Sequence, residues 1–245
     1  MKIALLGYGK MGHEVEAAAR AQGHEVVAVV DEAAGASRGS LESADVAVDF
    51  TTPDAALPNI VRVSSLGLDL VVGTTGWYNR LDDARAAVEN AGTGLVWAPN
   101  FSLGVQLFVR LARHAGRLVD GLEEYDVAVH ETHHRHKVDH PSGTAIRLAD
   151  VIVDAVGRKE RWKAGPPEGA PDPKVLWVTS TRAGEVPGTH QVLLEGPDDA
   201  VELRHTARGR SGFARGAVSA AAWVKGRKGF FGIEDMLAER FGALD

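Results

Sequence analysis

A glycine-rich hexapeptide near the start of the chain constrains the fold more than any other feature. Gly7-Tyr8-Gly9-Lys10-Met11-Gly12 has the pattern G-x-G-x-x-G. It follows the apolar run Ile3–Leu6, which predicts a buried strand, and it precedes residues with helical spacing. In this context the glycines permit a tight turn and close approach of a pyrophosphate, and the helix N-terminus offers N–H groups to the phosphates. The motif therefore predicts a dinucleotide site.

The rest of the first hundred residues alternates short apolar runs with amphipathic segments, a pattern typical of parallel strands linked by helices. The runs that predict buried strands are Ile3–Leu6, Val26–Val30, Val46–Phe50, Leu70–Val72 and Leu95–Trp97. Beyond residue 103 a long helical stripe precedes alternation of apolar and polar residues over 125–130. The sequence predicts an α/β fold: a Rossmann-like doubly wound parallel sheet plus a smaller α+β domain with an open mixed sheet.

An acid at the end of the second predicted strand bears on the cofactor. Asp31 stands roughly 20 residues beyond the glycine loop, where an acid receives the hydroxyls of the adenosine ribose. Because Asp31 and Glu32 would repel a 2′-phosphate, the sequence favours NADH over NADPH. Arg38 lies close enough in sequence to weaken that preference.

The composition excludes several classes of protein. The chain has no cysteine, so disulfides, thiolate metal sites and a cysteine nucleophile are excluded, and we expect a cytoplasmic location. No apolar run reaches the ~18 residues of a membrane-spanning helix, so we expect no membrane partner. A net charge of −6 argues against a general nucleic-acid binder, which carries a basic surplus.

Histidines gather in one segment of the second half. Residues 130–140 contain five of the ten histidines. One interpretation is a zinc site, because residues 130–134 match H-E-x-x-H. That motif requires a helix, whereas the preceding residues alternate as a strand, on which His130 and His134 would stand roughly 13 Å apart at ~3.3 Å per residue. We therefore expect no metal. A second interpretation is a solvated polar loop with incidental histidines.

A third interpretation is a catalytic loop beside an anion site. A histidine with a pKa near neutrality can donate a proton at working pH, and Lys137 adds a compact positive charge. Ser142-Gly143-Thr144 precedes a helix predicted over 144–156, so hydroxyls, N–H groups and the helix dipole converge on one anion. Together with the glycine loop, this segment favours an NAD(P)H-dependent reductase of a small dicarboxylic substrate.

The segment Glu131–Ala145 closely resembles the signature of 4-hydroxy-tetrahydrodipicolinate reductase, the dihydrodipicolinate reductase of the diaminopimelate route to lysine. Further stretches resemble other motifs of that family over nearly the whole chain: Phe50–Pro53, Gly73–Gly76, Ala98–Ser102, Gly188–His190, Phe213–Ala217 and Gly229–Leu237. The resemblance implies reduction of 4-hydroxy-tetrahydrodipicolinate to tetrahydrodipicolinate with loss of water, using NADH or NADPH.

The resemblance also implies roles for individual residues. His133 would be the proton donor, and Lys137 would assist it and hold a substrate carboxylate. The residues implied to bind substrate are His134, Ser142, Gly143 and Thr144. Those implied to contact the cofactor are Gly7, Tyr8, Gly9, Lys10, Met11, Gly12, Asp31, Gly73, Thr74, Thr75, Ala98, Pro99, Asn100 and Phe101.

Family members are commonly homotetramers that associate through the sheet of the second domain. We expect residues 1–103 and 216–245 to form the dinucleotide-binding domain. Residues 104–215 should form the substrate-binding and oligomerisation domain. A small dicarboxylate substrate and further copies of the chain are the expected partners.

The sequence departs from the family pattern at three places. Thr189 stands where the family usually has Glu, His140 replaces a small residue, and the glycine loop is one residue shorter than in many members. None of these removes a residue with an assigned chemical role. Two alternatives are another amino-acid or imine dehydrogenase of the same fold and a non-catalytic dinucleotide sensor. The first would not need the full histidine, lysine and Ser-Gly-Thr set, and the second would need no proton donor.

Overall fold

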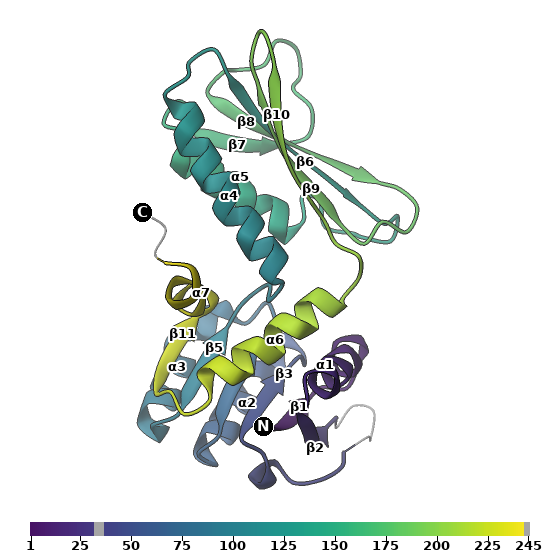
Figure 1. Ribbon diagram of the computed structural model, residues 1–245, viewed down its shortest axis with the longest axis vertical. Helices are drawn as coiled ribbons and strands as arrows, with labels where there is room; N and C mark the ends of the chain where they lie inside the picture. Colours follow the sequence, from purple (N-terminus) through teal and green to yellow (C-terminus); the bar gives the residue numbers. More distant parts are fainter. Residues whose placement is uncertain (32–36, 243–245) are drawn as a thin grey trace. The chain divides into compact units, whose positions relative to one another are not determined.

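The structure is a computed structural model of the 245-residue chain and describes residues 1–31 and 37–242. The chain divides into two compact units, one formed by Met1–Ser102 with Arg210–Asp245 and the other by Leu103–Gly209. Each unit has its own sheet (Figure 1). Within the described residues, no helix combines the length and apolar character that crossing a membrane requires.

The first unit is built on a six-stranded parallel sheet with the order β11-β5-β4-β3-β1-β2. Its strands are β1 (Lys2–Leu6), β2 (Glu25–Val30), β3 (Val46–Asp49), β4 (Asp69–Val72), β5 (Gly94–Trp97) and β11 (Gly229–Gly232). Its helices are α1 (Lys10–Ala21), α2 (Pro53–Ser65), α3 (Leu81–Ala91), α6 (Ser211–Val224) and α7 (Ile233–Phe241), with short 3₁₀ turns η1 (Leu41–Ser43) and η2 (Tyr78–Arg80).

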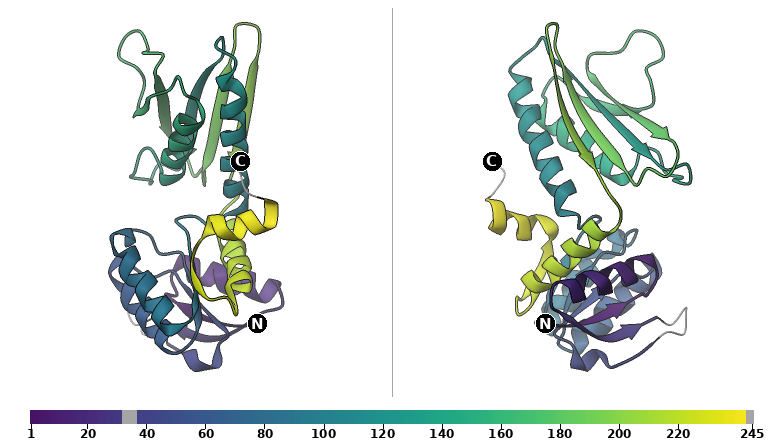
Figure 2. Two further views of the ribbon diagram at one scale, coloured as in Figure 1. Left: turned by 90° about the vertical axis from the view of Figure 1, so that its left-hand side faces the viewer. Right: turned by 45° about the vertical axis from the view of Figure 1, so that its right-hand side comes forward.

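Helices cover both faces of this sheet. α1 and α6 pack together on one face, and α2 and α3 pack together on the other (Figures 1 and 2). Alternate strand residues such as Leu70 and Val72 join Ile60 and Val88 of α2 and α3 in one buried cluster. Burial on both faces explains why these strands read as continuous apolar runs rather than as alternating ones.

The turn between β1 and α1 requires glycine at two positions. Gly7 has a φ of 82°, and a Cβ there would lie 2.5 Å from the Phe50 carbonyl oxygen. A Cβ on Gly12 would lie 2.4 Å from the Gly7 carbonyl oxygen. Glycine therefore supplies both the left-handed backbone of the turn and the close approach of α1 to β1.

The second unit contains a five-stranded mixed sheet with the order β10-β9-β6-β8-β7. Its strands are β6 (Asp126–His133), β7 (Arg161–Ala164), β8 (Val175–Arg182), β9 (Thr189–Glu195) and β10 (Ala200–Thr206), and its helices are α4 (Leu103–Asp120) and α5 (Gly143–Ala155). β8 runs parallel to both β6 and β7, whereas β9 runs antiparallel to both β6 and β10.

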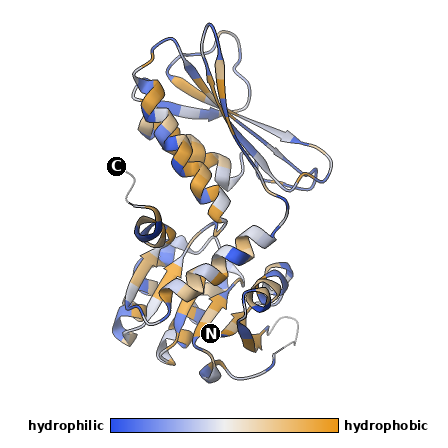
Figure 3. Cartoon of the chain, viewed as in Figure 1, coloured by the Kyte–Doolittle hydropathy of each residue, from blue (hydrophilic) through white to orange (hydrophobic). Residues whose placement is uncertain are grey.

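Both helices of the second unit pack on the same face of its sheet (Figure 2). Val127 and Val129 of β6 meet Leu148 and Ile152 of α5 in the buried core, and the apolar sides of both helices stand out in Figure 3. In the described part of this unit no helix covers the opposite face of the sheet (Figures 1 and 2).

The predicted fold class is confirmed, since a doubly wound parallel sheet and a second mixed sheet are both present. The sequence missed two short strands. β7 is largely exposed and shows no alternation, and β11 is a Gly-Phe-Phe-Gly segment that resembles a turn. β6 also extends beyond the predicted residues 125–130 to His133, because pairing with β8 and β9 continues through its polar end.

Candidate functional site

The glycine loop of the first unit borders a cavity of about 320 Å³. Gly7, Tyr8 and Gly9 line this cavity with Asp31 and the segment 50–52 that follows β3. The Tyr8 amide donates a hydrogen bond to Asp31 Oδ2 (2.8 Å), so the predicted ribose acid is joined directly to the predicted phosphate loop. This concave arrangement of turn, acid and helix start suits a dinucleotide.

The other predicted cofactor residues lie along the carboxyl edge of the same sheet. Lys10, Met11 and Gly12 form the first turn of α1, residues 73–75 follow β4, and residues 98–101 follow β5. The carboxyl ends of parallel strands share one edge, which is where such sheets bind ligands. In the described part of the chain these residues stand outside the lining of the 320 Å³ cavity.

A buried carboxylate that the sequence analysis did not single out joins two of these loops. Asp49 at the end of β3 has no exposed surface and accepts bonds from Thr51 N (2.9 Å), Thr51 Oγ1 (2.7 Å) and Thr74 Oγ1 (2.7 Å). Asn59 Nδ2 donates a further bond (2.8 Å). Burial raises the pKa of Asp49 although these bonds act to lower it. Asp49 thereby fixes the loop after β3 to the loop after β4.

Arg38 has an anionic partner inside the protein. Its Nη2 lies 2.8 Å from Glu16 Oε1, and its guanidinium carbon lies 5.0 Å from the centroid of the Tyr8 ring. The Tyr8 hydroxyl also donates a hydrogen bond to Glu16. Arg38 is thus held beside the glycine loop by Glu16, whereas Glu32 lies outside the described residues.

The histidine segment begins as the polar end of β6. Strand alternation places Glu131 and His133 on the buried side with Val127 and Val129, and His130 on the uncovered side, where its Nδ1 lies 2.8 Å from Thr179 Oγ1. Glu131 and His133, rather than the first and last histidines of H-E-x-x-H, therefore form the centre of a buried polar group on this side of the sheet.

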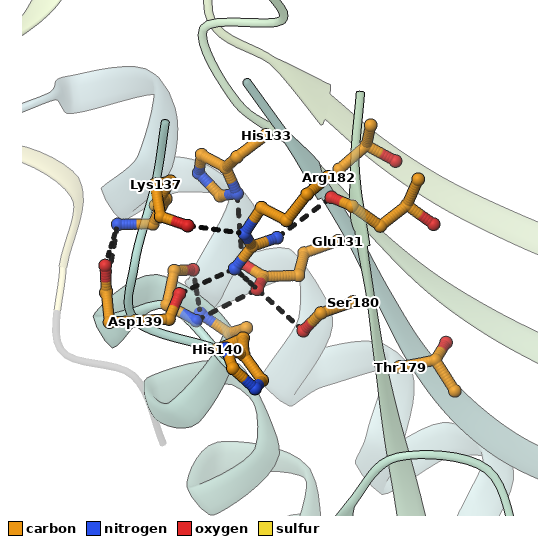
Figure 4. A network of polar contacts seen from close by, with 12 residues as sticks. Glu131, His133, Lys137, Asp139, His140, Thr179, Ser180 and Arg182 are labelled. Atoms are coloured by element: carbon orange, nitrogen blue, oxygen red, sulfur yellow. Dashed lines mark hydrogen bonds and ion pairs between the residues drawn. The ribbon is translucent and has the colours of Figure 1, made fainter. Parts of the chain in front are cut away.

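Neighbouring strands add residues to the same face. The antiparallel register places His190 of β9 opposite Glu131, and the parallel register places Ser180 and Arg182 of β8 beside Glu131 and His133. Ser142 caps the N-terminus of α5 and reaches the same carboxylate. We call the set Glu131, His133, Ser142, Ser180, Arg182 and His190 the His133 cluster; Figure 4 labels four of its members.

Glu131 is fully buried at the centre of the His133 cluster. Its Oε1 accepts hydrogen bonds from Ser142 N (3.0 Å), Ser180 Oγ (2.8 Å) and Arg182 Nη2 (2.8 Å). Burial alone would raise the pKa of Glu131, but the bonds from Ser142, Arg182 and Ser180 outweigh burial and lower it to about 2. Glu131 is therefore an anion throughout the neutral pH range.

Two imidazoles face the other carboxylate oxygen. His133 Nδ1 lies 3.1 Å from Glu131 Oε2, and His190 Nε2 lies 3.6 Å from it, with the two rings edge to face. Burial lowers the pKa of His133, although the Glu131 charge acts to raise it. Burial, reinforced by His133, lowers the pKa of His190 to about 4. Both imidazoles are thus predominantly uncharged at neutral pH.

Arg182 ties the loop after β6 to β8. Besides Glu131, its guanidinium donates to the carbonyl oxygens of Asp139 (2.6 Å) and Lys137 (3.3 Å). The Lys137 ammonium lies 2.8 and 2.9 Å from the two carboxylate oxygens of Asp139, at the edge of the cluster (Figure 4). Lys137 is therefore close to His133 and is already ion-paired.

The predicted substrate residues have different surroundings. Ser142 is buried; its amide donates to Glu131, and its hydroxyl accepts from Ala145 N (3.3 Å) and lies 3.1 Å from His190 Nε2. Gly143 begins α5 and is exposed, with no atom within 4 Å of a Cβ built on it. Thr144 follows in the same turn, whereas His134 lies beyond β6 beside His136.

Glu131, His133 and His190 bring three ligand-type atoms within 4.8 Å of one another. The same carboxylate is already paired with Arg182, and the Lys137 ammonium also lies nearby. The Arg182 charge on the carboxylate and the Lys137 charge near His133 oppose a bound cation. We therefore assign no metal to these residues.

No role was predicted from the sequence for Glu131, Ser180, Arg182 or His190. A signal for Glu131 was present, because strand alternation puts residues 131 and 133 on the face of Val127 and Val129. Ser180, Arg182 and His190 join the cluster only through strand register, which the sequence pattern does not specify.

Residues 1–101 match the family described as Dihydrodipicolinate reductase, N-terminus, and residues 104–237 match Dihydrodipicolinate reductase, C-terminus. The 4-hydroxy-tetrahydrodipicolinate reductase of Christiangramia forsetii is 37% identical over 241 residues, which cover 98% of this chain and 99% of that protein. The protein of the same name from Laribacter hongkongensis is 42% identical over 208 residues, 82% of this chain and 76% of that protein. A dipicolinate-bound dihydrodipicolinate reductase from Paenisporosarcina sp. TG-14 has 27% identity and a TM-score of 0.77, and the match covers 96% of this chain and 99% of that one.

Proposed function

The chain belongs to the dihydrodipicolinate reductase family, and we propose that His133 supplies the proton for its reaction. That reaction is the NAD(P)H-dependent reduction of 4-hydroxy-tetrahydrodipicolinate to tetrahydrodipicolinate in the diaminopimelate route to lysine. One hydride and one proton are taken up and one water is released. A bound nicotinamide cofactor supplies the hydride, so the chain itself must bind, orient and protonate.

The observation that carries this proposal is the position of His133 against an ionised, buried carboxylate. Burial lowers the pKa of His133, so the ring is mostly uncharged before substrate binds. A dicarboxylate bound beside the ring would raise its pKa, because negative charge favours the imidazolium. Substrate binding thus favours protonation of His133, and His133 then donates this proton to the substrate.

The carboxylate cradle that we propose combines Lys137 with the first turn of α5. Gly143 offers open space at a helix N-terminus, where backbone N–H groups and the helix dipole favour an anion. Ser142 contributes as the N-cap that holds this turn against Glu131, and Thr144 follows it in the turn. Lys137 would exchange its contact with Asp139 for a substrate carboxylate, with His134 contributing from the end of β6.

We further propose that NADH is preferred over NADPH. Asp31 lines the cavity at the glycine loop, where its carboxylate suits ribose hydroxyls and repels a 2′-phosphate. Arg38 could oppose this repulsion, but its guanidinium is held 2.8 Å from Glu16, a carboxylate that it shares with Arg20. The remaining predicted cofactor residues would complete the site along the carboxyl edge of the sheet.

We propose a homotetramer that assembles through the uncovered face of the second unit's sheet, in the cytoplasm. Leu193 of β9 is an exposed apolar residue on this face, opposite Ala128 of β6. Self-association buries such residues in a symmetric assembly. Light scattering coupled to size exclusion measures the assembly, and a monomer at micromolar concentration would contradict it.

A coupled assay tests the proposed function most simply. Freshly generated 4-hydroxy-tetrahydrodipicolinate is mixed with the chain and either NADH or NADPH, and the loss of absorbance by the reduced nicotinamide is followed. We expect turnover with both cofactors and a higher kcat/KM with NADH. Oxidation of neither cofactor would contradict the reaction, and a higher kcat/KM with NADPH would contradict the preference alone.

A further inference from the structure

We propose that Glu131 is a positioning residue that holds His133 as the Nδ1–H tautomer and leaves Nε2 to exchange the proton with substrate. The proposal rests on the proposed role of His133 as proton donor. The contacts of both residues, seen in Figure 4, support the assignment.

The two oxygens of Glu131 have different surroundings. Oε1 accepts hydrogen bonds from Ser142, Ser180 and Arg182, and these fix the group in the sheet. Oε2 and His133 Nδ1 are both buried, have no hydrogen-bond partner among the described residues, and lie 3.1 Å apart. An ionised carboxylate can only accept, so its favourable partner is an Nδ1 that carries hydrogen. A contact of this kind commonly tightens once substrate is bound.

His190 does not replace His133 as the main partner of the Glu131 carboxylate. Its Nε2 is farther from Oε2, at 3.6 Å, and closer to the Ser142 hydroxyl, at 3.1 Å. With a pKa of about 4, His190 is uncharged at neutral pH. The His190 ring packs edge to face on the His133 ring. The negative charge of Glu131 therefore acts mainly on His133.

A glycine keeps the other nitrogen of His133 uncovered. Gly188 precedes β9 with a φ of 151°, and a Cβ on it would lie 2.9 Å from His133 Nε2. Among the described residues Nε2 has no hydrogen-bond partner. The ring is thus held at Nδ1 and left open at Nε2, as a histidine that transfers a proton from one nitrogen must be.

The charged groups around His133 come from three strands and the loop after β6. After the burial of the ring, Glu131 has the largest effect on the pKa of His133, and it favours the protonated ring. Lys137 and Arg182 oppose protonation, Asp139 favours it weakly, and His190 is neutral. Removing the charge of Glu131 should therefore lower the pKa of His133 further. A Glu131 that only anchored Arg182 would leave the tautomer of His133 unchanged when its charge is removed.

The first test compares Glu131→Gln with a matched control. Gln keeps the size of the side chain and an oxygen for the Ser142 and Ser180 donors but removes the charge and turns an amide toward Nδ1. We expect kcat/KM to fall about 10- to 100-fold, the loss typical of removing a carboxylate that orients a metal-bound histidine. The fall of kcat/KM at high pH should move to lower pH. Glu160→Gln removes an exposed carboxylate paired with Lys174 and should leave the profile unchanged.

The second test reads the tautomer directly, without activity. Nitrogen-15 histidine spectra of the full chain, with the His133 signals assigned by their loss in His133→Gln, distinguish Nδ1–H from Nε2–H. We expect Nδ1–H in the wild type above the pKa of His133 and a shift toward Nε2–H in Glu131→Gln. If Glu131→Gln fails to fold, the wild-type spectrum alone decides.

The outcomes separate this proposal from the proposed function. A wild-type His133 in the Nε2–H form, or a Glu131→Gln variant with an unchanged pH profile and tautomer, would overturn the role of Glu131. Near-normal turnover by His133→Gln would overturn the proton donor instead, whatever tautomer the ring adopts.

Discussion

The buried pair of Arg182 and Glu131 should show strong energetic coupling. Arg182→Met keeps most of the aliphatic length of the side chain but removes the donor that lies 2.8 Å from Glu131 Oε1. It also removes the bonds to the carbonyl oxygens of Lys137, Asp139 and Thr181. The loop after β6 would lose its tie to β8, and a buried carboxylate would lose its counter-charge.

The loss in the free energy of unfolding caused by Arg182→Met can be divided between the bonds that depend on the Glu131 charge and those that do not. Leaving one member of a buried ion pair unpaired costs about 3–5 kcal/mol. The Arg182 side chain is 18% exposed, so we expect a total near the lower end, about 3 kcal/mol. The three carbonyl bonds, two of them exposed, account for roughly 1 kcal/mol of this in net terms. The coupling with Glu131 should therefore be about 2 kcal/mol.

A double-mutant cycle measures that coupling. Urea unfolding of the wild type, Arg182→Met, Glu131→Gln and the double variant gives the cost of the arginine with and without the buried charge. Arg182→Met should destabilise the Glu131→Gln background by only about 1 kcal/mol. Arg161→Met, which removes an exposed pair with Asp172, should cost at most ~0.5 kcal/mol. Equal costs of Arg182→Met in both backgrounds would refute the reasoning.

Three further predictions concern single residues. His190 has a pKa of about 4 against an ordinary 6.5, so the folded state binds its proton less readily than the unfolded state. The uncharged ring therefore contributes about 3 kcal/mol to the free energy of unfolding above pH 6.5, and this contribution is lost as pH falls toward 4. The free energy of unfolding of His190→Gln, measured against pH, should lack that loss. Gly188→Ala should cover His133 Nε2 and lower kcat more than it affects the cofactor KM; unchanged kcat would contradict this. Glu16→Gln should free Arg38 and raise kcat/KM for NADPH relative to NADH, and an unchanged ratio would show that Arg38 does not reach the 2′-phosphate.

Local patterns in the sequence predicted the first unit well, because its constraints are local. The glycine turn is read within one hexapeptide, and Gly7 does adopt the left-handed conformation that a tight turn needs. The five predicted strands correspond to β1–β5, since burial on both faces produces apolar runs. β11 could not be read in this way, because it enters the sheet from the other end of the chain beside β5.

The candidate site shows where local patterns end. His133, Lys137 and Ser142 lie within one segment, and the structure does bring them together. The partners that determine the chemistry of His133 come from two strands, β8 and β9, which lie 40 to 60 residues later and whose register no sequence pattern fixes. The sequence could therefore indicate a histidine donor but could not show Arg182 and His190 beside Glu131.

Turnover by His133→Gln is the most direct measurement of the proton donor. Gln keeps a polar side chain of similar reach but cannot donate as an imidazolium, so kcat/KM should fall about 10²- to 10⁴-fold. The dissociation constant for NADH, measured by calorimetry, should not change, because the glycine loop and Asp31 belong to the first unit. His136→Gln, which alters an exposed histidine three residues along the chain, serves as the matched control and should keep wild-type turnover. Turnover by His133→Gln within a few-fold of the wild type would contradict the assignment of His133 as the proton donor.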